Sequence, residues 1–504
     1  MAEPAVLVVD QGTTASAVCL IDRQGNIVAQ ADHDLTQYYP QPGWVEHDPE
    51  EIWRTVSDGI KDVLAVAGRR WQPTALGITN QRETVLLWER ETGRPLAPAI
   101  VWQDRRTAEQ CDRLRREGAE AAIREQTGLL LDPYFSATKI AWLLDAIPGA
   151  RSRAVNGELA VGTIDSWLIW RLTGGERHVT DRTNASRTLL YSLVAEEWDA
   201  DLGRLFDVPS ALLPEVVPSF GVVATTRPSA THGLSIPIAG LVGDQQAALF
   251  GQTCFRPGEA KNTYGTGCFL LVQTGSVRAR PRGRLLATAA IGASDEGDVY
   301  PSYALEGSVF VAGAAVQWLR DALGLIATAA ESEAVARTVP DSGGVYVVPA
   351  FTGLGAPYWD PYARGTIVGL TRGSERGHLV RATLEAIAFQ SCDLVRAIQE
   401  EGATPAALRV DGGAAGNDLL MQMQADLVGL PVERGQVQET TALGAGFLAG
   451  LGAGLWTSTK ELSGRWRLER RFLPQLSGPE REQRYQGWQR AVERARGWLA
   501  PDHS

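Results

Sequence analysis

A short polar turn near the start of the chain brings together a carboxylate, a glycine and two hydroxyl groups. The apolar run from Ala5 to Val9 predicts a buried strand, which ends at the sequence Asp10-Gln11-Gly12-Thr13-Thr14. A carboxylate that positions a metal ion, exposed backbone N–H groups and two hydroxyls are the groups that a magnesium–nucleotide complex needs. Taken alone, the pattern is also that of an ordinary hairpin with a polar turn.

Two further glycine turns follow predicted strands in the second half of the chain. Gly265-Thr266-Gly267 would let a phosphate approach the backbone closely, and Asp411-Gly412-Gly413 would admit a base or ribose between a strand and a helix. Each turn is a weak signal by itself, and the chain has neither a Walker A sequence nor a Rossmann glycine motif after a strand. In this order, the three turns resemble the phosphate and adenosine motifs of the actin, Hsp70 and sugar-kinase superfamily.

Two longer segments narrow this resemblance. Gly365 to Leu370 followed by His378 to Glu385 resembles the C-terminal signature of the FGGY carbohydrate kinases, and Tyr134 to Leu143 resembles their N-terminal signature up to a departure near Ala146. The resemblance implies an α/β fold of two duplicated actin/Hsp70/hexokinase-like (ribonuclease H-like) domains, with the active site in the interdomain cleft. It also implies ATP and Mg²⁺ as cofactors.

Within the family, the chain resembles the members that phosphorylate glycerol to sn-glycerol 3-phosphate. The segments that carry this likeness are 42–49, 77–84, 243–251, 262–269 and 349–360. By resemblance, the residues that bind the polyol are Arg82, Glu83, Trp102, Tyr134, Asp244, Gln245 and Phe269. Three hydroxyls in a small space need several converging donors and acceptors, which this set contains, because a buried unpaired hydroxyl costs about 1–3 kcal/mol.

Each of these residues also has a purely structural interpretation. Without the resemblance, Arg82 and Glu83 would be an ion pair at a strand end, Trp102 would be a core aromatic residue, and Asp244 would cap the following helix. The resemblance favours Asp244 as the general base that takes the proton from the attacking hydroxyl.

The same comparison assigns the nucleotide side of the site. It implies that Asp10 holds Mg²⁺ and that the nucleotide is bound by Thr13, Thr14, Ala15, Thr266, Gly313, Gln317, Gly413 and Asn417. Ala15 and Ala17 stand where a familiar member has Ser and Arg, so a backbone contact at Ala15 can survive but a side-chain contact at Ala17 cannot. The segment Ala224 to Ser235 lacks the loop that accompanies inhibition by fructose 1,6-bisphosphate in some members.

The elements that must position these residues can be read from periodicity and length. A chain of 504 residues favours two domains, which we place at 1–252 and 253–504. Asp48-Pro49-Glu50 predicts the start of a helix that runs to about Ala67. A surface helix is expected from Pro479 to Leu499. Strands are expected at 5–9, 15–22, 27–30, 75–79, 236–242, 259–262, 268–272 and 408–410.

Composition limits the partners and the compartment. The 48 basic and 59 acidic residues give a net charge of −11, which argues against nucleic acid or an anionic membrane as a partner. Five cysteines without a C-x-x-C pair, and a start unlike a signal peptide, indicate reduced thiols in a cytoplasmic protein. Ala442 to Trp456 is too short to span a bilayer, and its glycines predict a close helix contact instead. The resemblance implies a homo-oligomer, a dimer or tetramer.

Two alternative functions remain open at this point. One is a kinase of the same family that acts on a ketose or pentitol such as xylulose. The other is a non-catalytic actin-like or chaperone-type ATPase, which would leave the polar set around Arg82 and Asp244 without a role.

Overall fold

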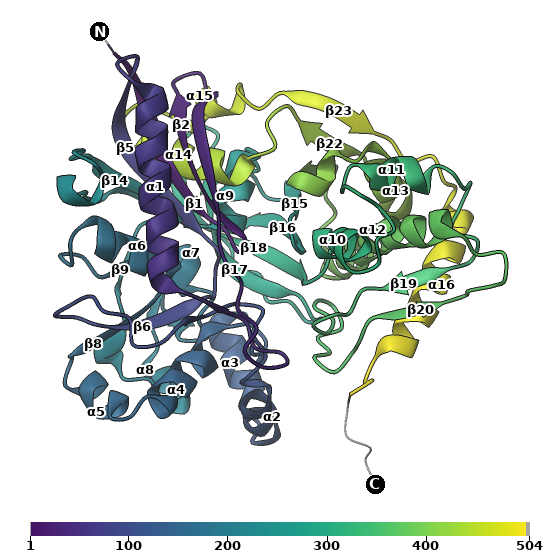
Figure 1. Ribbon diagram of the computed structural model, residues 1–504, viewed down its shortest axis with the longest axis horizontal. Helices are drawn as coiled ribbons and strands as arrows, with labels where there is room; N and C mark the ends of the chain where they lie inside the picture. Colours follow the sequence, from purple (N-terminus) through teal and green to yellow (C-terminus); the bar gives the residue numbers. More distant parts are fainter. Residues whose placement is uncertain (1, 500–504) are drawn as a thin grey trace.

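Two mixed sheets, one from each half of the chain, organise the computed structural model, which describes residues 2–499. In Figure 1 the first half, purple through blue to teal, lies on the left, and the second half, teal through green to yellow, lies mainly in the centre and on the right. The outermost residues of the two predicted domains, 1 and 500–504, lie outside the described part. The boundary between 252 and 253 stays a prediction.

The first sheet contains the strand that ends at the polar turn. Its order is β13-β14-β5-β1-β2-β3. The strands are β1 (Glu3–Gln11), β2 (Ala15–Asp22), β3 (Ile27–Asp34), β5 (Trp71–Asn80), β13 (Phe220–Thr225) and β14 (Pro237–Gly243). β1 pairs antiparallel with β2 and parallel with β5. The predicted three-stranded meander β1-β2-β3 is therefore present.

Helices cover both faces of this sheet, which explains why β1 is apolar throughout its centre. Helix α1 (Pro49–Ala67) begins as predicted, because the Asp48 side chain accepts from the Glu50 N–H and proline occupies the first turn. It packs on β2 and β3, whereas α14 (Thr440–Gly452) packs on β14, β5 and β1. Although α14 comes from the second half, it lies beside the purple strands in Figure 1.

The glycines of α14 allow it to touch α9 (Asp244–Gly251) through backbone atoms. A Cβ placed on Gly444 would lie 1.8 Å from the Ala247 carbonyl oxygen, and one on Gly251 would lie 2.0 Å from the Thr440 oxygen. The predicted close helix contact is therefore confirmed. Within residues 2–499, no helix is long and apolar enough to cross a membrane.

The second sheet repeats the plan of the first. Its order is β17-β18-β16-β15-β21-β22-β23. The strands are β15 (Ala260–Tyr264), β16 (Cys268–Gly275), β17 (Leu286–Ala293), β18 (Val299–Val309), β21 (Leu408–Asp411), β22 (Val432–Gly435) and β23 (Leu468–Phe472). β15 pairs antiparallel with β16 and parallel with β21, as β1 does with β2 and β5. The predicted duplicated α/β plan is confirmed.

Helices from the second half complete its core. They include α10 (Gly313–Asp321), α12 (Arg376–Glu400), α13 (Asp418–Val428) and α16 (Gly478–Ala495). α16 ends at Ala495 rather than at the predicted Leu499, and it is anchored because Tyr485 and Trp488 both donate hydrogen bonds to the buried Asp393 carboxylate of α12.

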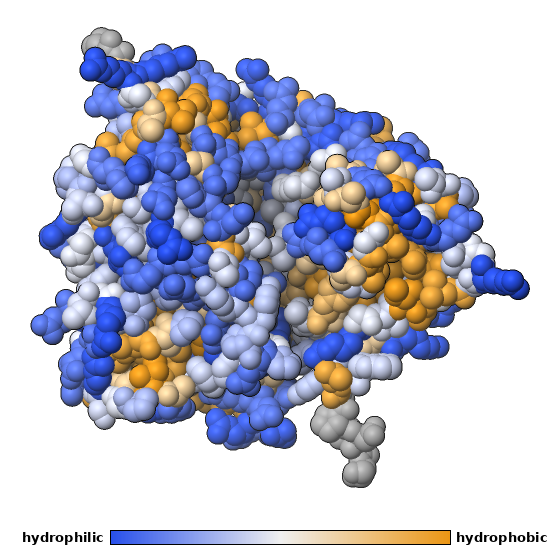
Figure 2. Space-filling model, viewed as in Figure 1, coloured by the Kyte–Doolittle hydropathy of each residue, from blue (hydrophilic) through white to orange (hydrophobic). Residues whose placement is uncertain are grey.

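The space-filling view shows a mainly hydrophilic face with separate hydrophobic patches over each half (Figure 2).

Candidate active site

All seven predicted polyol residues line one cavity of about 240 Å³. Asp10, Thr13, Thr14 and Thr266 line the same cavity, so the structure brings the predicted phosphate-side residues to it as well. Residues from both halves of the chain therefore meet there.

The order of parallel strands explains this convergence. Gly243 of β14 lies beside Asn80 of β5, which lies beside Gln11 of β1. Asp244, Arg82 and Asp10 each lie within two residues of this row. The carboxyl ends of adjacent parallel strands share one edge of a sheet, so side chains far apart in sequence are delivered to a single place.

Asp244 is the first residue of α9, and its side chain reaches the cavity with 26% of its surface exposed. Its Oδ1 accepts from the Gln245 N–H at 2.6 Å and lies 3.1 Å from Nε of Arg82. Burial raises the pKa of Asp244, and the charge of Arg82 opposes that rise. A carboxylate with a raised pKa is better suited than a free one to accept a proton near neutral pH.

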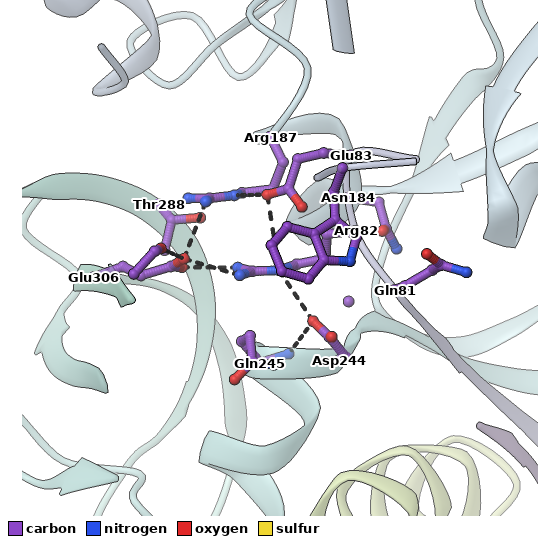
Figure 3. A network of polar contacts seen from close by, with 12 residues as sticks. Gln81, Arg82, Glu83, Asn184, Arg187, Asp244, Gln245, Thr288 and Glu306 are labelled. Atoms are coloured by element: carbon purple, nitrogen blue, oxygen red, sulfur yellow. Dashed lines mark hydrogen bonds and ion pairs between the residues drawn. The ribbon is translucent and has the colours of Figure 1, made fainter. Parts of the chain in front are cut away.

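Arg82 and Glu83 belong to a buried network of four charged side chains (Figure 3). Arg82 donates from Nη1 to Glu306 Oε2 at 2.7 Å and from Nη2 to Glu306 Oε1 at 2.9 Å. Arg187 donates from Nε to Glu83 Oε1 at 2.6 Å and from Nη2 to Glu306 Oε1 at 3.0 Å. Burial would raise the pKa of Glu306, but Arg187 and Arg82 hold it down at about 2, so Glu306 is ionised.

Gln245 is held from the second sheet. The buried Lys261 of β15 donates from Nζ to Gln245 Oε1 at 2.5 Å and to Thr263 Oγ1 at 2.8 Å. Burial lowers the pKa of Lys261 to about 8, although the charges of Asp411 and Asp244 oppose this. The lysine therefore remains mostly protonated at neutral pH and holds two residues that line the cavity, Gln245 and Thr263.

Aromatic rings form the apolar wall of the cavity. Trp102 packs against Tyr134 and Phe269, with ring centroids 5.8 Å apart in each pair. The Trp102 indole donates to Thr13 Oγ1 at 2.9 Å, so this wall also touches the polar turn. Such rings can cover the carbon chain of a polyol and exclude water.

A second cavity of about 500 Å³ adjoins the first, because Gly265 and Thr266 line both. Of the predicted nucleotide residues, it is lined by Thr266, Gly313, Gln317, Gly413 and Asn417. Gly313 begins α10, where a Cβ would lie 2.5 Å from the Gly265 carbonyl oxygen, and Asn417 caps α13. The N–H groups at the start of a helix favour a negatively charged group.

Asp10 and Ala15 differ in how the structure places them. Burial raises the pKa of Asp10 to about 7, and the nearby charges of Asp244 and Asp32 add to the effect. Ala15 lines neither cavity, and its carbonyl oxygen accepts from the Gly12 N–H at 2.9 Å within the turn. Its predicted contact with the nucleotide therefore has less geometric support than those of Thr13 and Thr14.

Sequence reasoning missed Glu306, Arg187 and Lys261. Each is fully buried. The signal that could have found Glu306 is a charged residue inside a mainly apolar strand, β18; Lys261 lies in β15, whose sequence AKNTY is largely polar and gives no such signal. Such a residue is retained only with a partner, and here the partners are cavity residues.

Comparison with known protein families agrees with this geometry. Residues 5–251 match the N-terminal domain of the FGGY family of carbohydrate kinases, and residues 260–453 match the C-terminal domain of the same family. The chain belongs to this family. The FGGY resemblance inferred from the sequence is therefore confirmed. Because the members of this family are carbohydrate kinases, the alternative of a non-catalytic actin-like or chaperone-type ATPase is disfavoured.

Several FGGY relatives match over almost their whole length. A glycerol kinase from Aromatoleum aromaticum is 60% identical over 497 residues, which are 98% of this chain and 99% of the relative. A glycerol kinase from Symbiobacterium thermophilum is 56% identical over 497 residues, again 98% of this chain and 99% of the relative.

Solved structures show the same two-lobed fold. Plasmodium falciparum glycerol kinase with ADP has a TM-score of 0.87 at 37% identity and covers 98% of both chains. A xylulose kinase from Lactobacillus acidophilus has a TM-score of 0.85 at 24% identity and covers 99% of both chains, a likeness that concerns the fold alone.

Proposed function

We propose that this FGGY kinase transfers the terminal phosphoryl group of ATP to glycerol and releases sn-glycerol 3-phosphate. The observation that carries the proposal is the small cavity in which all seven predicted polyol residues meet the turn at Asp10. A volume of about 240 Å³ suits a three-carbon polyol beside a phosphate group. The names of the relatives at 56–60% identity support glycerol over a ketose.

In this proposal each side chain has a definite task. Asp244 accepts the proton of the attacking hydroxyl, while Arg82, Glu83 and Gln245 orient the hydroxyl groups. Trp102 and Phe269 cover the carbon chain. Positioning and charge stabilisation of this kind supply most of the rate enhancement in phosphoryl transfer.

The nucleotide occupies the adjoining cavity of about 500 Å³, with its phosphates directed toward Thr266. Thr13, Thr14 and the backbone of the turn contact the phosphates, Gly313 and Gln317 lie along them, and Gly413 and Asn417 contact the ribose or base. The ADP in the Plasmodium falciparum relative supports an adenine nucleotide.

Magnesium fits the residues around Asp10. The raised pKa of Asp10 comes from burial beside Asp244 without a compensating cation, so a divalent cation would relieve the repulsion. No group of three or more His, Cys, Asp or Glu side chains within residues 2–499 could hold a metal. The ion would therefore be held by Asp10, water and phosphate oxygens, an arrangement typical of Mg²⁺, and it would neutralise charge on the phosphates.

A homo-oligomer and a cytoplasmic location complete the proposal. The five cysteines are free and buried, which suits a reducing compartment. Gel filtration with light scattering would measure the oligomeric state.

The proposed activity is tested by measuring ADP release from ATP in the presence of Mg²⁺. Separate reactions contain glycerol, xylulose, another ketose or a pentitol, and one reaction contains no acceptor. We expect the highest kcat/KM with glycerol and formation of glycerol 3-phosphate. A higher kcat/KM with xylulose would assign the protein to the ketose kinases, and equal rates with and without an acceptor would show an ATPase.

A further inference from the structure

Arg82 uses only part of its hydrogen-bonding capacity within the protein. The edge formed by Nη1 and Nη2 is taken by Glu306, and Nη1 also donates to Gln246 Oε1 at 3.2 Å. The Nε–H is buried and has no hydrogen-bond acceptor within residues 2–499, although Asp244 Oδ1 lies 3.1 Å from Nε. The Nε–H thus lies in an ion pair with Asp244 but makes no hydrogen bond within the described residues, so it can still donate to a ligand in the cavity.

Glu83 is divided in the same way. Its Oε1 accepts from Arg187, while no group within the described residues donates to Oε2. The backbone of Glu83 adopts a left-handed φ of 61°, which is costly for a residue with a side chain and is retained mainly where the site requires it. Glu83 therefore directs one acceptor oxygen to the cavity that it lines.

Gln245 completes the pattern from the other sheet. Because Lys261 can only donate, the atom that faces it at 2.5 Å is the amide oxygen Oε1. The amide nitrogen Nε2 of Gln245 is left as a donor for the cavity. Arg82, Glu83 and Gln245 thus each form a hydrogen bond with a buried charged residue through one part of the side chain. Another polar atom of each side chain can form a hydrogen bond with a ligand in the cavity.

We propose that Glu306, Arg187 and Lys261 are positioning residues that determine which donors and acceptors the cavity offers to the polyol. They do not line the cavity, so they act through the residues that do. The inference rests on the proposed function and deepens it, since it assigns the selectivity for hydroxyl groups to a buried layer that consists of Glu306, Arg187 and Lys261. This layer presents the donors of Arg82 and Gln245 and the acceptor of Glu83.

The network also ties the site to the relative position of the two sheets. Glu306 lies on β18 of the second sheet, whereas Arg82 and Glu83 follow β5 of the first. Figure 3 shows the Glu306 carboxylate facing both guanidinium groups. Buried ion pairs are often no better for stability than apolar residues of the same size, so their retention here fits a role in specificity.

The test is the nearly isosteric variant Glu306→Gln, assayed with glycerol and with 1,2-propanediol, which lacks one hydroxyl. The glutamine amide has only one acceptor oxygen, so it cannot replace the two carboxylate oxygens that accept from Nη1 and Nη2 of Arg82. The Nε–H of Arg82 then loses its fixed direction. We expect kcat/KM for glycerol to fall roughly ten- to a hundredfold, mainly through KM, with the KM for ATP changed less than about twofold. The preference for glycerol over the diol should fall by a similar factor.

A merely structural role would lower kcat/KM for both acceptors equally, and that result would overturn the proposal. Asp393→Asn is the matched control, because this buried carboxylate binds Tyr485 and Trp488, and none of these three residues lines either cavity. It should lower the midpoint of thermal unfolding without changing the preference for glycerol.

Two further variants keep the test decisive if Glu306→Gln does not fold. Ser308→Ala removes a neutral donor to Glu306 Oε1 at 2.9 Å, and Lys261→Met removes the charge that orients Gln245. Both should reduce the preference for glycerol, Ser308→Ala by a few-fold, and an unchanged preference in both would also overturn the proposal. Wild-type activity is measured first, so a failure of the proposed function is seen separately as absence of glycerol phosphorylation.

Discussion

Replacing Asp244 by asparagine isolates proton acceptance from the other tasks of this side chain. Asparagine has nearly the same shape, and its Oδ1 can still accept from the Gln245 N–H, which lies 2.6 Å from the aspartate oxygen. The asparagine side chain can also remain beside Arg82, whose Nε lies 3.1 Å from Oδ1 of the wild-type aspartate. The lost property is the ability to take a proton, which is worth roughly 10²- to 10⁴-fold in rate.

The expected fall in kcat of Asp244→Asn therefore corresponds to about 3 to 5 kcal/mol of barrier. We would measure ADP release at saturating ATP and glycerol, and glycerol binding by calorimetry with a non-hydrolysable ATP analogue. Wild-type kcat should rise with pH through the pKa of Asp244, since the base acts in its deprotonated form, and the variant should lose this rise.

A variant with intact glycerol binding and a kcat within about tenfold of the wild type would refute Asp244 as general base. A variant that loses glycerol binding to the same extent as kcat/KM would assign Asp244 to binding instead.

Four other outcomes are expected. Thr13→Ala should raise the KM for ATP or lower kcat about tenfold, more than Ala15→Ser does in the same assay, because Thr13 lines the cavity and Ala15 does not. Gly444→Ala should destabilise the protein by about 3 kcal/mol or more in urea unfolding, because its Cβ would lie 1.8 Å from a carbonyl oxygen; Gly464→Ala, with open space around it, should be close to neutral. Burial lowers the pKa of His47 to about 4, so the folded state stays neutral while the unfolded chain binds a proton. The fall in stability between pH 7 and pH 5 should therefore be about 2 kcal/mol smaller in His47→Gln than in the wild type, which keeps both His47 and the similarly buried His178. Fructose 1,6-bisphosphate at low millimolar concentration should leave the activity unchanged in the coupled assay.

The elements near the start of the chain could be predicted because local signals agree with the fold. β1 is a short apolar run that is covered on both faces, and α1 begins at an aspartate followed by proline. The end of α16 was less predictable, because helical spacing continues past Ala495 where the structure shows no helix.

The residues that line the cavity followed from the family likeness, whereas the buried layer behind them did not. Arg82 and Glu306 are 224 positions apart, and no local pattern indicates that they meet. Their pairing depends on how β5 and β18 are brought together by the packing of two sheets. The family motifs therefore identify the residues that line the cavity, but they do not identify the buried residues that hold those residues in place.

The glycine-lined contact between α9 and α14 has a mechanical consequence. The chain passes from the first sheet to the second through α9, and it returns to pack on the first through α14. Because the two helices meet through backbone atoms, a side chain added at Gly251 or Gly444 would have no room to change rotamer and would push the helices apart. Since α14 also packs on β14, β5 and β1, that displacement would reach the strand ends that carry the cavity residues.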